Sequence, residues 1–158
     1  MTAIEIREDM THLQALALTA FGEARGDGYR GLVAVCWSAR NRLARPQRFG
    51  ATYKAVVHAR AQYSCWWPYG GVGNYAAVMA AAKDVVMGVR PAQGSPLALA
   101  FQAAVDVIED RVIDPTNGAT HYYMPAEMKP PGRVPIWAAP PAQLSAELGG
   151  HRFYTHVA

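Results

Sequence analysis

Hydrophobic residues recur at helical spacing in four segments of the chain. In the first segment the recurring residues are Leu13, Leu16, Ala17, Ala20 and Phe21. Thr11 and Gln14 precede them with the spacing of a capping box, and two glycines follow at positions 26 and 28. This pattern predicts a helix at residues 11–24.

The other three helical segments also carry start or stop signals. A stripe from Leu32 to Leu43 predicts a helix that ends before Pro46, because a proline disfavours helical geometry at the residue before it. Asn74 can cap a third helix, which the glycine and proline at residues 88–91 end. Ser95, followed by a proline in the first turn, predicts the start of a fourth helix.

The remaining segments have no helical period. Residues 46–73 predict a long shaped loop with a short element near Val56, and loops of that length are often functional. The turn at residues 114–118 leads into a predicted strand at residues 119–124. Prolines make residues 125–142 a wrapping segment before a short element at residues 151–156. We therefore expect a mainly helical α+β fold with a small β element, in one domain spanning residues 1–158.

Length and composition limit the class of protein. A chain of 158 residues has the size of one domain. Its apolar runs are much shorter than the roughly 20 residues that span a bilayer, and residues 1–20 lack a basic start followed by an apolar block. We expect no membrane span and no signal peptide. For Cys36 and Cys65 we favour two free thiols over one disulfide bridge.

The positive charge is unevenly distributed, although the net charge is only +3. No Asp or Glu occurs between Asp27 and Asp84. The arginines of this stretch that we expect to form a positive surface are Arg40, Arg42, Arg45 and Arg48. Such a surface favours an anionic partner, which can be wall polymer, outer-membrane surface, phospholipid or nucleic acid; the alternative is an ordinary solvated helix face.

Glu23 is the acidic residue with the most informative position. It lies on the shoulder of the first apolar stripe, just before a glycine-rich turn, where a carboxyl is half-buried. Burial disfavours the ionised form of a carboxyl, as a general acid requires. The alternative is a structural ion pair between Glu23 and Arg25 or Arg30.

Glycosidases usually need a second carboxylate, and here none is obvious. Asp27 and Asp114 lie in turns that can approach Glu23, but either can instead simply cap its turn. A reaction that uses a single carboxyl therefore suits the sequence better.

Two polar and aromatic clusters could bind a sugar, whose rings need flat apolar faces beside hydrogen-bonding groups. The first consists of Gln62, Tyr63, Ser64, Trp66, Trp67 and Tyr69. The second consists of Asn117, Thr120, His121, Tyr122 and Tyr123. The alternative for the aromatic residues is core packing. Because successive side chains of a strand point to opposite sides, we expect one set of the second cluster to face a cleft and the other set to face the core.

Other catalytic chemistries have little support. The five histidines include no HExxH motif, so we expect no zinc and no other cofactor. Ser64 does not lie in a GxSxG elbow, which argues against acyl transfer.

Four blocks of the sequence, taken together, resemble the SleB-like cell-wall hydrolases. The first runs from Leu16 to Gly26 (LALTAFGEARG) and continues with GLVAV at residues 31–35 and RNR at residues 40–42. The second, residues 62–64, resembles the QFS element of the family. The third, residues 114–123, resembles its DPTxGAxxY segment. The fourth, Trp137 with residues 151–154, resembles its closing W…HxFY. The blocks occur in family order over nearly the whole chain.

The resemblance implies a lysozyme-like, lytic-transglycosylase-like fold and cleavage between N-acetylmuramic acid and N-acetylglucosamine of peptidoglycan. It places the catalytic glutamate at Glu23. Related enzymes act as lytic transglycosylases, in which one glutamate first donates a proton and then accepts one while a 1,6-anhydro ring closes. The resemblance places Gln62, Tyr63, Ser64, His121 and Tyr122 along the cleft, with His151 and Tyr154 closing it.

Some features depart from the family. Tyr63 replaces the usual phenylalanine, and no spore-type binding repeats are present, which argues against a spore-cortex role. We expect a monomeric phage endolysin of a GC-rich Gram-negative host, held in the host cytoplasm before lysis and acting on the periplasmic wall. The alternatives are a hydrolytic muramidase that uses Asp114 or Asp27, and a non-catalytic module that binds cell wall or nucleic acid.

Overall fold

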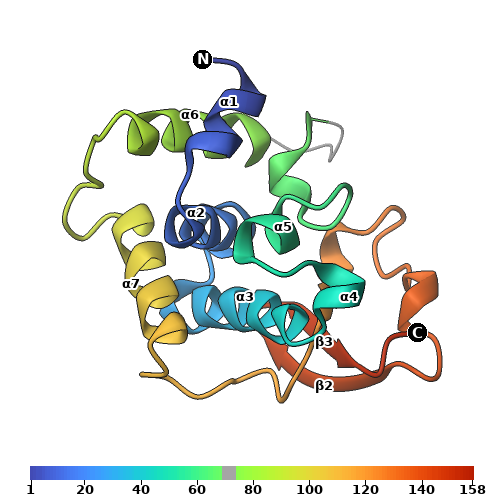
Figure 1. The fold of residues 1–158 in the computed structure, drawn as a ribbon. Coiled ribbons are helices and arrows are strands. Elements are labelled where there is room, and N and C mark those ends of the chain that lie inside the picture. The colour runs from blue at the N-terminus through green and yellow to red at the C-terminus, as the bar shows by residue number, and fades with distance from the viewer. Residues whose placement is uncertain (69–73) are drawn as a thin grey trace.

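The computed structural model describes residues 1–68 and 74–158. Helices make up most of the fold, and a small sheet lies on one side (Figure 1). The helices are α1 (Ala3–Asp9), α2 (His12–Ala24), α3 (Gly28–Leu43), α4 (Pro46–Phe49), α5 (Tyr53–Val57), α6 (Asn74–Val86) and α7 (Pro96–Ile108). The strands are β1 (His121–Tyr123), β2 (Gln143–Leu148) and β3 (His151–Thr155). This confirms the predicted mainly helical α+β fold.

Helix α2 lies at the centre of the core, where α3, α5, α6 and α7 all pack against it. The single apolar stripe predicted for this helix is wrong in detail. Leu13 and Phe21 of that stripe remain partly exposed, whereas Ala15 and Leu18 outside it are completely buried. A helix surrounded by other helices is apolar on all sides.

Side-chain caps fix the starts of the helices. The Thr11 hydroxyl accepts a hydrogen bond from the backbone N–H of Gln14 at 3.1 Å, and the Gln14 side chain accepts one from the backbone N–H of Thr11 at 2.9 Å. Ser95 accepts from the backbone N–H of Ala98 at 3.1 Å. Both predicted helix starts are thus confirmed, and each cap satisfies backbone donors that lack partners inside the helix.

The three strands form an antiparallel sheet in the order β1-β3-β2. Strand β3 is central and carries the buried Phe153, which packs with Ala34 of α3. Strand β2 was not predicted, because its mostly exposed edge position leaves no buried alternation in the sequence. The sheet brings residues near 120 and near 150 together beside α3.

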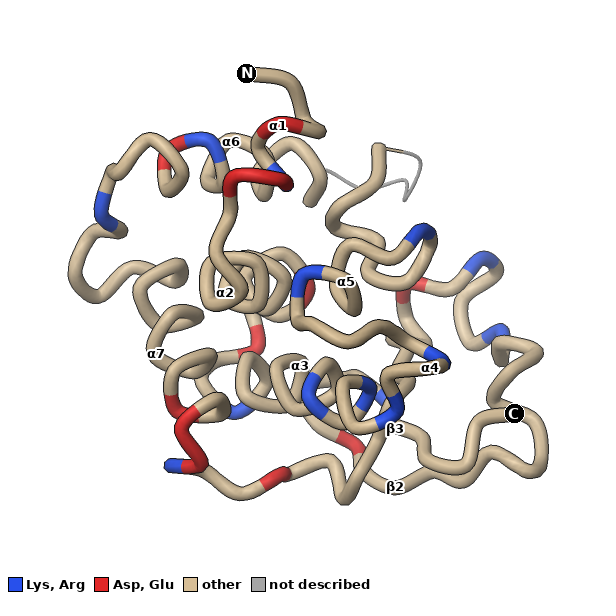
Figure 2. The backbone as a smooth tube through the Cα atoms, in the orientation of Figure 1, with Lys and Arg blue, Asp and Glu red and all other residues tan. Residues whose placement is uncertain are grey.

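The predicted four-arginine surface does not form as one unit. Arg42 is buried, with its side chain only partly accessible from one cavity described below. Arg40 forms an ion pair with Asp110 at 2.6 Å. Arg45 and Arg48 are exposed. Figure 2 shows that the basic residues of α3 and α4 lie close to one another beside the sheet.

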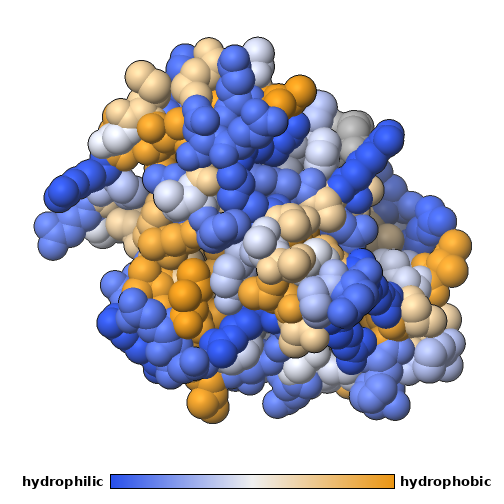
Figure 3. Space-filling model, viewed as in Figure 1, coloured by the Kyte–Doolittle hydropathy of each residue, from blue (hydrophilic) through white to orange (hydrophobic). Residues whose placement is uncertain are grey.

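Hydrophilic residues cover much of the face shown in Figure 3, between smaller hydrophobic patches. Within residues 1–68 and 74–158, no helix has the length and apolar character needed to cross a bilayer. Cys36 and Cys65 are both buried free thiols, as predicted.

Candidate active site

The carboxyl of Glu23, in the last turn of α2, is held by groups from two distant segments. Oε1 accepts hydrogen bonds from the backbone N–H of Cys65 at 3.0 Å and from the Ser64 hydroxyl at 3.4 Å. Oε2 accepts a hydrogen bond from the Tyr122 hydroxyl at 2.8 Å. Glu23 is partly buried, so these contacts fix its position while part of the side chain remains accessible.

Gly22 allows the segment at residues 62–66 to approach α2 this closely. A Cβ atom at Gly22 would lie 2.5 Å from Cγ2 of Val78 and 2.6 Å from Cβ of Cys65, distances that real Cβ contacts do not show. The segment is also anchored in the core, where Trp66 Nε1 donates to the Thr19 hydroxyl at 2.8 Å. The missing side chain at Gly22 thus lets the Cys65 backbone reach Glu23.

Tyr122 reaches Glu23 from β1. Burial and the neighbouring Glu23 charge raise the pKa of Tyr122 well above its usual 10. Its hydroxyl therefore keeps its hydrogen at neutral pH and remains available as a donor to the carboxyl. The ring packs against His151 and Phe153, with centroid distances of 5.3 and 5.2 Å, and this packing fixes the direction of the hydroxyl.

The alternative structural role for Glu23, an ion pair with arginine, is not observed among the described residues. Arg25 instead donates to the carbonyl oxygens of Phe21 and Gly22, both at 3.4 Å, and its guanidinium lies over the Phe21 ring. Arg30 is exposed. The Glu23 carboxyl is therefore not neutralised by a neighbouring cation.

A cavity of about 290 Å³ opens beside Glu23. It is lined by Gly22, Glu23, Ala24, Arg25, Gly26, Asp27, Asn74, Met124 and Glu127. Two further carboxylates, those of Asp27 and Glu127, thus share this space with Glu23. Glu127 was not predicted as a site residue, although it lies just after the predicted strand that carries Tyr122.

Asp114 has a structural role in its turn. Its Oδ1 accepts hydrogen bonds from the backbone N–H and the hydroxyl of Thr116, at 2.8 and 2.6 Å. Its Oδ2 accepts from Asn41 Nδ2 and from the backbone N–H of Gly118, both at 2.9 Å. These four donors tie the turn to α3. Asp114 thus caps its turn, which is the structural alternative that the sequence offered for it.

Asp27 contacts the histidine that packs on Tyr122. Its Oδ2 lies 3.1 Å from Nδ1 of the buried His151. A Cβ atom at Gly149 would lie 2.9 Å from Cγ of Asp27, so the chain passes the carboxyl closely. Asp27, His151, Tyr122 and Glu23 therefore form a connected row from the start of α3 to the end of α2.

The residues predicted at positions 62–66 divide into two groups. Gln62 and Ser64 are exposed. Tyr63 and Trp66 are only 1% and 0% exposed, so their rings belong to the core and offer no face to a ligand in this structure. Tyr63 and Trp66 therefore pack in the core, which is the alternative expected for the aromatic residues. Tyr69 lies outside the described residues.

The residues predicted in the second cluster alternate across the sheet. Tyr122 faces Glu23, whereas Tyr123 and Tyr154 stack on each other in a second small core with Trp137. His121 is partly exposed, and its Nδ1 lies 2.9 Å from the hydroxyl of the buried Thr120. Asn117 is a turn residue with a positive φ of 54°, and its Nδ2 donates to the Ser145 carbonyl.

Within residues 1–68 and 74–158, no three His, Cys, Asp or Glu side chains are grouped as a metal site. The carboxyl groups of Glu23, Asp27 and Glu127, which line the cavity, can transfer protons.

Comparison with known proteins gives one family. The family model described as Cell Wall Hydrolase matches residues 26–154, which is most of the chain, and Glu23 lies just before the matched range. Searches of curated proteins and of solved structures gave no match.

Proposed function

The chain belongs to the cell wall hydrolase family, whose substrate is peptidoglycan, and we propose on this basis that it cuts the glycan strand with Glu23 as general acid and base. The bond is that between N-acetylmuramic acid and N-acetylglucosamine. The observation that supports this most strongly is the Glu23 carboxyl itself, which three donors hold at the edge of a cavity and which pairs with no arginine among the described residues.

The contacts of Glu23 distinguish its two oxygens. The backbone N–H of Cys65 can only donate, so Oε1 remains the accepting oxygen in either ionisation state. Oε2 faces a hydroxyl whose hydrogen can rotate, and it can therefore carry a proton. We assign the transferable proton to Oε2.

The reaction proceeds as a lytic transglycosylation. Glu23 donates its proton to the glycosidic oxygen while the bond from that oxygen to C1 of the muramic acid breaks. The C6 hydroxyl of the same sugar then bonds to C1 and returns its proton to Glu23. No water is consumed, and the product is a 1,6-anhydro ring. One carboxyl suffices for both steps, and Asp114 is fully engaged by its turn.

A hydrolytic muramidase is the second candidate, and one observation favours it. Asp27 and Glu127 line the same cavity as Glu23. Either carboxylate could activate a water molecule on the opposite face of the sugar, as the second carboxylate of an inverting glycosidase does. Asp114 was also a candidate for the second carboxylate, but Glu127 lines the cavity and Asp114 does not.

Products distinguish the candidates. Purified protein is incubated with sacculi in oxygen-18 water, and the released muropeptides are analysed by mass spectrometry. Transglycosylation gives anhydro ends without the isotope, whereas hydrolysis gives reducing ends that contain it. Glu23→Gln should reduce either product at least about a hundredfold, as expected when a general acid is removed. Release of free stem peptides, or full activity of Glu23→Gln, would contradict the proposal.

We also propose that the enzyme acts as a phage endolysin that accumulates in the host cytoplasm and reaches the periplasmic wall at lysis. The supporting feature is the match to a cell wall hydrolase family, because lysis of a host requires that its wall is cut. Added protein should lyse Gram-negative cells whose outer membrane has been permeabilised. A non-catalytic wall-binding module would leave those cells intact.

A further inference from the structure

The Arg42 guanidinium is a buried positive charge without a carboxylate partner among the described residues. Arg42 is 4% exposed. Its Nε donates to the Thr120 carbonyl at 2.6 Å and its Nη1 to Oε1 of Gln62 at 2.8 Å. Both acceptors are neutral. Buried charges in proteins are normally paired with an opposite charge, so this site favours an anionic ligand.

The guanidinium is held rigidly. Its Cζ lies 5.1 Å from the centre of the Phe49 ring and 5.0 Å from that of the Tyr63 ring. Together with the two hydrogen bonds, these rings fix the plane of the guanidinium. Nη2 makes no hydrogen bond within the described residues, so one edge of the group remains available to a ligand. A planar guanidinium with a fixed orientation suits a carboxylate.

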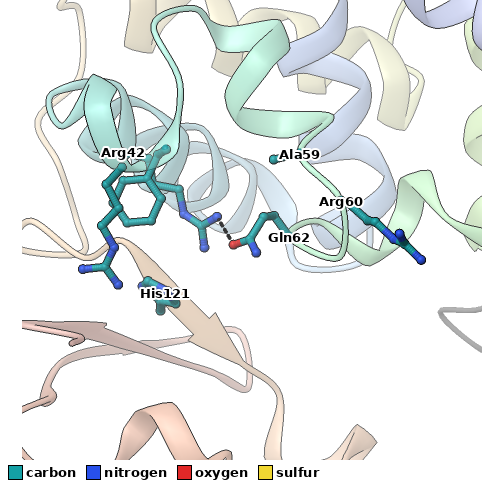
Figure 4. A pocket seen from close by; sticks show the side chains of 7 residues that line it. Arg42, Ala59, Arg60, Gln62 and His121 are labelled. Carbon is teal, nitrogen blue, oxygen red and sulfur yellow. Dashed lines mark hydrogen bonds between the residues drawn. The ribbon is translucent and has the colours of Figure 1, made fainter.

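A cavity of about 270 Å³ opens at this position. Its lining residues, of which none is acidic, are Arg42, Arg48, Phe49, Ala59, Arg60, Gln62 and His121. Figure 4 shows Arg42 and Gln62 pointing toward each other above His121, with Arg60 farther along. The volume lies just below the ~300–1,000 Å³ of typical ligand pockets, so it can hold one small group such as a carboxylate.

The charge state of His121 reflects the same electrostatic field. Burial, together with the charges of Arg42 and Arg48, lowers the pKa of His121 to about 4. His121 is therefore neutral at neutral pH, and the cavity is positive through its arginines alone. Arg48 already donates to the backbone oxygens of Val157 and Ala158, both at 2.7 Å, so an anionic group that enters would be bound mainly by Arg42, with no carboxylate in the lining to repel it.

The cavity adjoins the candidate active site along two segments. Gln62 lies two residues from Ser64, which contacts Glu23. The Tyr63 ring between them lies 5.0 Å from Cζ of Arg42 and 6.3 Å from the ring of Tyr122, which also contacts Glu23. A glycan bound at Glu23 would thus bring its substituents to this cavity.

We propose that this cavity is a subsite for a free carboxylate of the peptide stem carried by the muramic acid next to the cleaved bond, with Arg42 as its anchor. The inference rests on the proposed function, since it assumes that peptidoglycan binds along Glu23. With this subsite the enzyme recognises the peptide stem as well as the sugar.

The test uses Gln62→Glu, because replacing Arg42 risks unfolding the protein. The new carboxylate would pair with Arg42 and repel an incoming one, while the fold keeps its thermal stability. Gln93→Glu is the matched control, since Gln93 is exposed, lies in the connection between α6 and α7, and gives the same charge change. All binding measurements use the Glu23→Gln background, so that the substrate stays intact.

Co-sedimentation gives the Kd for native sacculi and for sacculi whose stem carboxyls have been converted to carboxamides. We expect amidation to weaken binding roughly tenfold, as loss of a charge-assisted contact does. Gln62→Glu should weaken binding to native sacculi by a similar factor. Amidation of the sacculi should then lower the affinity of this variant little further. Gln93→Glu should behave like the parent protein on both.

Equal affinity for native and amidated sacculi would overturn the proposal. If Gln62→Glu still weakened binding in that case, and inorganic phosphate competed, the anion would be a phosphate of an envelope polymer. Failure of the proposed function is seen separately, as absence of glycan products from the wild-type protein. The Kd for sacculi and the formation of glycan products therefore test the two proposals separately.

Discussion

The Tyr122 hydroxyl donates a hydrogen bond to Oε2 of Glu23 at 2.8 Å, joining residues 99 positions apart in the chain. Helix α2 provides the acid and strand β1 provides the donor. The hydroxyl stabilises the ionised form of Glu23, which the transglycosylase mechanism generates after the first proton transfer. Tyr122 is therefore a positioning residue for the proposed general acid.

Replacing Tyr122 with phenylalanine tests this role. The ring contacts with His151 and Phe153 remain, so the fold should be retained, while turnover should fall roughly tenfold to a hundredfold because a hydrogen bond to a charged group is lost. The pH profile of kcat should also shift. Tyr53→Phe is the control, since Tyr53 lies on α5 and makes none of the contacts of Glu23. Unchanged kcat and pH profile would remove Tyr122 from the mechanism.

Gly22→Ala should affect both stability and activity. The new Cβ would overlap Val78 and Cys65, at a cost of about 1–3 kcal/mol in the free energy of unfolding. It would also move the Cys65 N–H away from Glu23. Gly26→Ala is the matched control for the unfolding measurement, because a Cβ there has no heavy atom within 4 Å. Denaturant unfolding and sacculus turnover measure the two effects, and equal behaviour of both variants would contradict the close packing.

Asp114→Ala distinguishes a structural carboxylate from a catalytic one. Removing the acceptor of four hydrogen bonds should lower the free energy of unfolding by at least about 2 kcal/mol. Turnover per folded molecule should stay within roughly threefold of the wild type, below the hundredfold effect of losing a general acid or base. A stable but inactive variant would show that Asp114 takes part in the chemistry.

His58 should make the protein sensitive to acid. Burial, together with the charges of Arg7 and Lys54, lowers its pKa from 6.5 to about 4. Between these values the unfolded chain binds a proton that the folded protein does not, so the free energy of unfolding decreases as the pH falls from 6.5 to 4. His58→Gln should reduce this slope, measured by urea unfolding at several pH values. The same change at the exposed His12 should leave the slope unaltered.

The sequence predicted helices well where a cap and an apolar stripe occur together. Thr11 and Ser95 mark starts that the structure confirms. Helix α1 was missed although Thr2 and Glu5 form the same capping box, because the helix is short and has one fully buried residue, Ile6. Strand β2 was missed because an edge strand carries little hydrophobic alternation.

The candidate site was predicted less completely than the fold. Glu23 was identified from its position beside a turn, and its contacts with Ser64 and Tyr122 agree with a shared site. The Cys65 backbone N–H has no signal in a sequence, because every residue except proline carries this donor. Tyr63 and Trp66 were assigned to ligand binding since residue type alone does not distinguish a core ring from a cleft ring.

The central position of β3 has a consequence for biosynthesis. Strand β3 holds β1, and with it Tyr122, in register with the helical core. During translation α2 leaves the ribosome well before β3, because β3 follows it far along the chain. Glu23 and its Tyr122 donor therefore come together only after β3 has been synthesised, so a chain that ends before β3 lacks the finished candidate site.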